Sequence, residues 1–128
     1  FASVQNPMKE PKVSSDQLDF TSAHGTATLY NDEMEAIAFN RMNLQNVPLN
    51  SIKGYYGHCL GASGLLESII SMESALKNTL IPSKNFEEMG VSQDLNIITE
   101  NQSADIKYIL KTASGFGGCN AVIVLEKA

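Results

Sequence analysis

The stretch KGYYGHCLGASGLLESIISMESAL, from Lys53 to Leu76, decides how the rest of the chain is arranged. It opens with a cation, turns to the glycine-flanked His58 and enters a segment whose apolar residues have helical spacing. Glycine has no Cβ, so the small residues at 61–64 allow close backbone approach. We expect a helix that is buried on at least one face. Lys53 and His58 would then be held at its rigid entrance, as catalysis requires. The apolar residues are Leu65, Leu66, Ile69, Ile70, Met72 and Leu76.

The composition is that of one acidic domain. The chain has 128 residues, 43% of them hydrophobic, and a formal net charge of -5. This length supports a real core. The acidic balance argues against nucleic acid, because phosphate binding needs clustered Lys and Arg. No apolar run approaches the roughly 20 residues that span a bilayer, so we expect no membrane contact.

The cysteines and the start of the chain predict its setting. Cys59 and Cys119 are too few for a disulfide framework and lie in no CxxC pair. No signal peptide is visible, so we expect a reduced cytoplasmic location, with both cysteines as small structural residues. The chain begins at Phe1, and we expect it to be a piece of something longer.

Short apolar runs on both sides of the central stretch predict strands. A helix over 31–42 is expected to be capped by Asn31 or Asp32, with Glu35 three residues after Asp32 as in a capping box. A glycine-dense turn at 114–120 predicts a hairpin between the last two strands. The β-α-β-α-β-β-β order predicts an α/β fold, a mixed sheet with helices packed on it. Residues 1–15 are predicted to be a lead-in and 16–128 the domain. Strands are expected at 16–23, 47–51, 95–98, 106–113 and 121–125, with an extended segment at 79–83.

His24 ends the first predicted strand and has two interpretations. It is either an acid/base or oxyanion donor at the mouth of a sheet, or a strand-end histidine bonded to backbone. Thr26 and Thr28 lie two residues apart, so their side chains point the same way in an extended chain. They can grip a polar ligand or simply cap the turn.

Three further features of the chain keep alternatives open. Lys53 can hold the neighbouring His58 neutral, or the lysine can be solvated and the histidine structural. Glu67 lies either on an exposed edge or buried with a partner. The Gly115–Gly118 turn can offer backbone N–H groups to an oxyanion, or serve only as a tight turn. A strand follows it, so there is no helix N-terminus for phosphate.

Three motifs in order join these signals: HGTATLYNDEMEA, KGYYGHCLGASGLLES and GFGGCNA. Together they resemble the C-terminal half of β-ketoacyl-[acyl-carrier-protein] synthases over residues 18–125. Two histidines, rather than His and Asn, resemble the elongating class. The resemblance implies the thiolase fold, of which this chain is the second of two similar α/β halves. Ala27, Gly54 and Ser114 stand where the family commonly has Gly, Ser or Thr, and Phe.

The resemblance implies a decarboxylative Claisen condensation in fatty-acid or related polyketide synthesis, between malonyl-carrier protein and an acyl group on a cysteine. No residue here matches that cysteine, so we expect the chain alone to be inactive, and no metal is implied. We expect His24, His58, Lys53 and Phe116 to converge in space. The implied roles are His24 and His58 at the malonyl thioester, Lys53 in electrostatic tuning, Thr26 and Thr28 on the pantetheine arm, Phe116 in the oxyanion hole and gate, and Glu67 in support.

The resemblance also implies partners. These are acyl carrier protein, the N-terminal half of the same synthase, and a second subunit in a homodimer or heterodimer. No cofactor is expected, because the pantetheine arm arrives on the carrier protein. The alternative is a non-catalytic partner subunit similar to a chain-length factor, which retention of His24 and His58 disfavours. A carrier-binding module is a third interpretation and rests only on the short chain.

Overall fold

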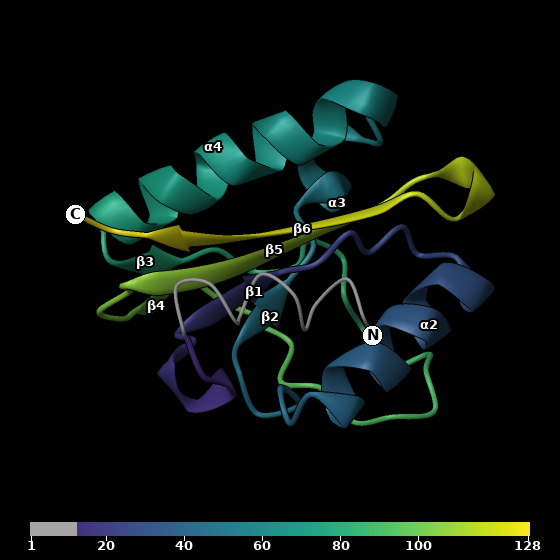
Figure 1. The fold of residues 1–128 in the computed structure, drawn as a ribbon, viewed down its shortest axis with the longest axis horizontal. Helices are drawn as coiled ribbons and strands as arrows, with labels where there is room; N and C mark the ends of the chain where they lie inside the picture. The colour runs from purple at the N-terminus through teal and green to yellow at the C-terminus, as the bar shows by residue number, and fades with distance from the viewer. Residues whose placement is uncertain (1–12) are drawn as a thin grey trace.

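A four-stranded mixed sheet forms the centre of the molecule in a computed structural model, which describes residues 13–128 (Figure 1). The strand order is β2-β1-β5-β6. Strand β1 (Phe20–Ser22) pairs in parallel with β2 (Leu49–Asn50) and with β5 (Tyr108–Ser114). Strand β5 pairs antiparallel with β6 (Asn120–Glu126) through the glycine-dense hairpin. The predicted mixed sheet and hairpin are therefore confirmed.

Helices lie on both sides of this sheet. Helix α2 (Leu29–Arg41) and helix α4 (Ser63–Leu76) flank it from opposite sides, as Figure 1 shows. The short helix α3 (Lys53–Tyr56) and the 3-10 turn η2 (Leu60–Ala62) lead into α4. Gly57 and Leu60 have φ angles of 84° and 50°, which interrupt the helical path between them.

Short irregular elements complete the fold. Strands β3 (Thr79–Leu80) and β4 (Gln102–Ser103) form a small antiparallel pair, of which the sequence indicated only the first. The remaining 3-10 turns are η1 (Ser15–Gln17) and η3 (Phe116–Gly118). The strand expected at 95–98 is reduced to one parallel bridge from Ile97 to Leu49. No helix among residues 13–128 has the length and apolar character to cross a membrane.

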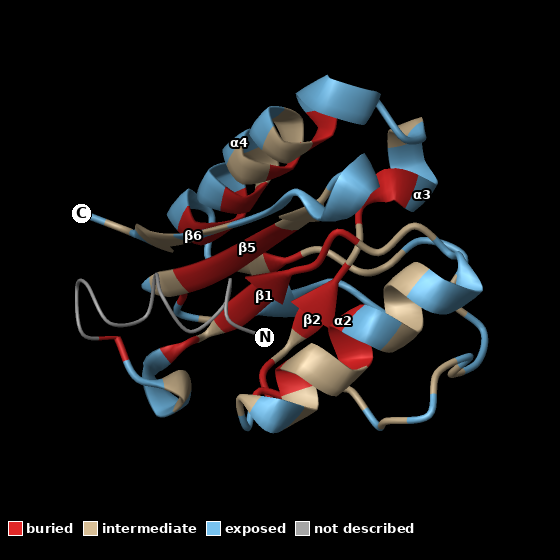
Figure 2. Ribbon diagram, turned by 45° about the vertical axis from the view of Figure 1, so that its right-hand side comes forward, coloured by how far each residue is buried: buried red, intermediate tan, exposed pale blue. Residues whose placement is uncertain are grey.

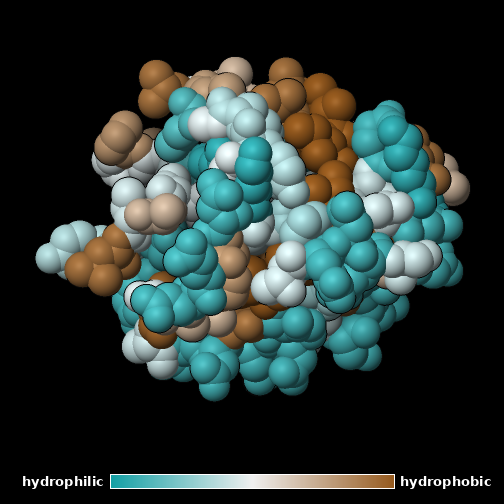
Figure 3. Space-filling view, turned by 180° about the vertical axis from the view of Figure 1, so that it is seen from behind, coloured by the Kyte–Doolittle hydropathy of each residue, from teal (hydrophilic) through white to brown (hydrophobic). Residues whose placement is uncertain are grey.

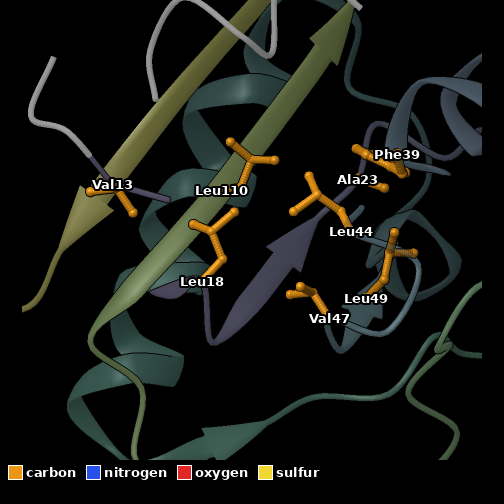
Figure 4. Packing of buried hydrophobic residues seen from close by; sticks show 8 residues of the cluster. All are labelled: Val13, Leu18, Ala23, Phe39, Leu44, Val47, Leu49 and Leu110. Atoms are coloured by element: carbon orange, nitrogen blue, oxygen red, sulfur yellow. The ribbon is translucent and has the colours of Figure 1, made fainter. Parts of the chain in front are cut away.

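The core consists of two apolar clusters, one on each face of the sheet. Neighbouring β5 residues Ile109 and Leu110 join different clusters, because side chains alternate along a strand. Helix α2 contributes Phe39 to one cluster and α4 contributes Ala75 to the other. The first cluster, shown in Figure 4, is Val13, Leu18, Ala23, Phe39, Leu44, Val47, Leu49 and Leu110. The second is Phe20, Ala75, Leu80, Ile98, Ile106 and Ile109.

Helix α4 packs on the sheet through polar and small residues, which is the reverse of the expected arrangement. Its buried residues are Ser63, Glu67, Ser71, Ser74 and Ala75. Small side chains let the helix lie close to the strands, and the Ser71 hydroxyl donates to the Glu67 carbonyl at 2.7 Å. The outer side, which we name the apolar stripe, is exposed by 50–69% and consists of Leu65, Ile69, Met72 and Leu76.

Figures 2 and 3 agree with this orientation of helix α4. Burial colouring shows the face of α4 toward the strands as buried and its outer face as exposed (Figure 2). Seen from behind, hydrophobic atoms gather in the upper part of the molecule, where α4 lies, above a mostly hydrophilic lower part (Figure 3). Helix α4 is buried on one face as expected, but polar and small residues form that face and the apolar stripe lies outside it.

The start of helix α2 also differs from the prediction. Its N-cap is Thr28, so the helix begins before the expected residue 31. Asp32 and Glu35 form no capping box, because both carboxylates accept backbone N–H groups from the preceding turn. At the other predicted boundary, most of the 1–15 lead-in lies outside the described residues, while Val13 is buried in the core. The division into lead-in and domain therefore stays a prediction.

Candidate active site

His24 follows β1 directly and its backbone is fixed by a buried carboxylate. The His24 N–H donates to Glu35 Oε1 at 3.0 Å and to Thr112 Oγ1 at 3.1 Å. The Gly25 N–H donates to Glu35 Oε2 at 2.8 Å. Gly25 has a φ of 40°, and a Cβ there would lie 2.5 Å from the Ser51 Cβ. The turn after β1 thus holds one conformation.

Glu35 was assigned to a helix cap by the sequence and is instead part of this site. It is 6% exposed and also accepts the Thr112 hydroxyl at 2.6 Å. The signal available in the sequence was its place one residue before Ala36 and four before Phe39, both buried on α2. A carboxylate on the buried side of a helix requires polar partners.

Lys53 lies beneath His24 rather than in solvent. Its side chain is 7% exposed, and Nζ lies 2.5 Å from Glu67 Oε1. Nζ also donates to the His24 carbonyl and lies 3.3 Å from His24 Nδ1. The prediction that Lys53 belongs to the site is supported by this geometry, but its ring partner is His24 instead of the neighbouring His58.

The second imidazole stacks edge-on against the first. The ring centroids of His24 and His58 lie 5.2 Å apart with an interplanar angle of 79°. His24 follows strand β1 and His58 follows the short helix α3, 34 positions further along the sequence. The predicted convergence of His24, His58 and Lys53 is therefore confirmed.

Hydrogen bonds define the tautomer of both rings. The Leu60 N–H donates to His58 Nδ1 at 3.0 Å, so this nitrogen accepts. The Lys53 ammonium has only donors, so His24 Nδ1 also accepts. A neutral imidazole carries its proton on the other nitrogen, which is Nε2 in both rings. The site thus holds two Nε2–H donors.

The surroundings favour neutral His24. Burial lowers the pKa of His24 below its ordinary value of 6.5, and the positive charge of Lys53 lowers it further. The carboxylates of Glu35 and Glu67 oppose this effect only in part. The ring is therefore uncharged at neutral pH and can donate from Nε2 without first losing a proton.

Glu67 is buried between two lysines. Its side chain is 1% exposed, with Oε1 2.5 Å from Lys53 Nζ and Oε2 2.5 Å from Lys111 Nζ. Lys111, on β5, is 2% exposed and was missed by the sequence analysis, because a single Lys in an apolar run gives no sign of its burial. The open question about Glu67 is answered by the buried alternative.

His58 lines a cavity of about 790 Å³, whereas the buried His24 is not among the described residues of its wall and reaches it only through its contact with the His58 ring. Lys53 and His58 line it, as do Thr26 and Thr28, whose hydroxyl oxygens lie 2.7 Å apart. The loop over 83–91 forms the opposite wall. Gly54 permits this approach, because a Cβ there would lie 2.7 Å from the Lys84 carbonyl oxygen.

The other predicted site residues lie elsewhere. Phe116 is 97% exposed at the tip of the β5–β6 hairpin and is not among the described residues that line the cavity. The structure therefore does not place it with the histidines. Cys59 and Cys119 are exposed free thiols, and neither appears in the described cavity wall. The expectation that both cysteines are packed structural residues is wrong.

Comparison with known proteins gives one family. The family model "Beta-ketoacyl synthase, C-terminal domain" matches residues 2–87. The 3-oxoacyl-[acyl-carrier-protein] synthase 2 of Coxiella burnetii is 30% identical over 128 residues, covering 97% of this chain and 31% of the relative. The chain thus spans about a third of the length of such curated relatives.

Solved structures agree with this match. A β-ketoacyl synthase from Burkholderia phymatum superposes with a TM-score of 0.92 at 29% identity, covering 98% of this chain and 31% of that one. A ketosynthase in complex with its chain length factor, from Xenorhabdus doucetiae, gives 0.90 at 25% identity, covering 99% and 33%. These matches confirm the thiolase-like fold, C-terminal half, and the chain belongs to the β-ketoacyl synthase family, as its C-terminal domain.

Proposed function

We propose that the complete protein is an elongating 3-oxoacyl-[acyl-carrier-protein] synthase and that this chain supplies its decarboxylation site. The observation that carries the proposal is the pair of stacked imidazoles, whose ring centroids lie 5.2 Å apart, each accepting at Nδ1, with His58 in the cavity wall. Two Nε2–H donors near one point suit an oxygen that gains negative charge. The name of the Coxiella burnetii relative supports the carrier-protein substrate.

The proposed chemistry begins with loss of CO₂ from a malonyl thioester. The electrons of the broken C–C bond form an enolate, whose oxygen accepts from the Nε2–H groups of His24 and His58. The enolate carbon then attacks an acyl thioester, a new C–C bond forms, and the cysteine thiolate leaves. Keeping His24 neutral leaves its Nε2–H as a donor while the Lys53 ammonium supplies positive charge behind it.

The cavity fits the arm of a carrier protein. Thr26 and Thr28 share a wall with His58, and their paired hydroxyls can donate to the amides of a pantetheine chain. We retain for Phe116 the proposed role at the gate and in the oxyanion hole. Its full exposure on the hairpin leaves room for the remainder of the protein to pack against it.

The N-terminal half is the proposed source of the nucleophile. Neither cysteine of this chain contributes to the described cavity wall, and the apolar stripe of α4 offers a surface for another domain. The complete protein is proposed to work as a homodimer or heterodimer. The alternative is a non-catalytic partner subunit similar to a chain-length factor. The similar structure from Xenorhabdus doucetiae is a complex of a ketosynthase with such a factor.

The test is product analysis with the complete protein, labelled acyl-carrier protein and malonyl-carrier protein. We expect release of CO₂, a 3-oxoacyl product and an acyl adduct on a cysteine outside this chain. The isolated chain, run in parallel, should give no condensation product, because it has no acyl-enzyme to attack. Absence of product from the complete protein, restored only when a second ketosynthase subunit is added, would favour the partner-subunit alternative.

A further inference from the structure

Lys111 is a charged residue in the middle of strand β5, at a place where its neighbours Ile109 and Leu110 are core residues. Its side chain is 2% exposed. A buried ammonium is unfavourable unless it is paired and fully hydrogen-bonded. Desolvation lowers the pKa of Lys111, and the contact with Glu67 opposes this effect. The chain therefore keeps a destabilising charge at one defined point.

The surroundings of the Lys111 ammonium are built entirely from oxygen. Nζ donates to the carbonyl oxygens of Thr112 at 2.6 Å, Ala23 at 3.2 Å and Ser22 at 3.3 Å. An ammonium has three donors, which these carbonyls share with the Glu67 carboxylate. The Glu67 Oε2 atom then lies in ion-pair contact at 2.5 Å. Every polar contact of this group is consequently fixed.

This arrangement divides the two oxygens of one carboxylate between two cations. Oε2 of Glu67 lies against Lys111 and Oε1 against Lys53, each at 2.5 Å. With Oε2 held, Glu67 cannot rotate away from Lys53. Lys53 in turn lies 3.3 Å from His24 Nδ1, the contact that assigns the His24 proton to Nε2. The series Lys111, Glu67, Lys53, His24 thus runs from the core to the pair of stacked imidazoles.

We propose that Lys111 is a positioning residue for the decarboxylation step: it fixes Glu67, so that Glu67 fixes Lys53 and Lys53 holds the Nε2–H tautomer of His24. The inference rests on the proposed function of the same site. Lys111 touches no substrate in this arrangement and acts only through the other three residues. Its positive charge also adds to that of Lys53 in keeping His24 neutral.

The first test compares Lys111→Met with Lys107→Met in the complete protein. Lys107 is a matched control, because it immediately precedes the same strand and pairs with Glu126 in solvent, with 57% of its side chain exposed. Two half-reactions are measured: malonyl-carrier protein decarboxylation and acyl-enzyme formation. We expect Lys111→Met to slow decarboxylation about 10- to 100-fold, a range typical of losing a residue that orients a functional group, with acyl-enzyme formation unchanged. Lys107→Met should alter neither.

The pH profile separates positioning from folding. The charged groups facing His24 are Lys53, Lys111, Glu35 and Glu67. Removing the Lys111 cation should raise the pKa of His24, so the acid limb of the decarboxylation profile should move to higher pH. Glu67→Gln should move it to lower pH, because it removes a carboxylate. An equal loss in both half-reactions, with an unmoved acid limb, would mean a structural role only and overturn the inference.

A double variant keeps the test decisive if Lys111→Met does not fold. Lys111→Met with Glu67→Gln removes one buried charge of each sign, so the net charge of the buried group is unchanged and Lys53 still donates to the His24 carbonyl. Because Lys111 positions Lys53 through Glu67, the double variant should decarboxylate at the rate of Glu67→Gln alone, measured at a pH above the acid limb, where His24 is neutral in both. A further loss of about tenfold or more would show an independent effect and contradict the inference. If the unaltered complete protein releases no CO₂, the proposed function itself fails, which is a different result.

Discussion

In the proposed reaction His24 donates to the developing enolate through a single nitrogen, so its loss has a defined result. In the complete protein, His24→Ala should lower the rate of malonyl decarboxylation about 10²- to 10³-fold, the usual effect of removing one oxyanion donor. Acyl-enzyme formation should continue, because that step uses groups of the other half. The two rates are measured with labelled CO₂ release and mass spectrometry. Loss of acylation with decarboxylation intact would contradict the assignment.

The lowered pKa of His24 has a pH signature. The unfolded chain binds a proton near pH 6.5, whereas the folded ring binds it only at lower pH. Stability should therefore be level above pH 6.5 and decrease as pH falls below this value toward the folded pKa. Thermal unfolding of the complete protein from pH 7.5 to 5, against a His24→Asn variant, measures this slope. An identical slope in the variant would exclude His24 as its source.

The sequence predicted the central residues of the site but not the groups that hold them. His24 and His58 lie in connections between elements, and Lys53 opens the short helix α3 that follows such a connection, where polar residues often indicate function. Glu35 and Lys111 lie inside a helix and a strand, where a charged residue ordinarily predicts a solvent-facing position. Their burial depends on partners far along the chain, such as the contact between Lys111 and Glu67. Only the folded arrangement reveals such pairs.

At the scale of elements, Glu35 connects helix α2 to the turn after β1. Glu35→Gln should lower the free energy of unfolding by about 2–3 kcal/mol. The NH₂ group of glutamine would point at a backbone N–H of His24 or Gly25, which would then have no acceptor. Glu73→Gln is the control, since its exposed pair with Lys77 contributes little. Urea unfolding of the complete protein measures both, and equal stabilities would contradict the role given to Glu35.

The sequence predicted the type of each main helix and strand better than it predicted which face of a helix is buried. The long β5–β6 hairpin and helix α2 follow from local periodicity and turn residues. The orientation of α4 did not follow, because the apolar stripe predicts a buried face without saying which domain buries it. The segment at 95–98 forms a single bridge, since only Ile97 meets the short edge strand β2.

At the scale of the molecule, the apolar stripe predicts how the isolated chain behaves. Four large apolar side chains on one helix are 50–69% exposed, so the chain alone should self-associate at micromolar concentration. Leu65→Gln with Ile69→Gln should reduce this without unfolding, because neither residue packs in the core. Sedimentation velocity measures the effect. If the unaltered isolated chain is a monomer at all concentrations, the apolar stripe does not cause self-association.

The outward orientation of α4 also has a calorimetric consequence. Unfolding raises heat capacity because it newly hydrates apolar surface, by about 12–15 cal/mol/K per residue in complete domains. The stripe is already hydrated in the folded chain, so Leu65, Ile69, Met72 and Leu76 contribute little to that increase. The isolated chain should therefore show a smaller heat-capacity change per residue than the complete protein. The free energy of unfolding of the isolated chain should therefore vary less steeply with temperature, on both cooling and heating.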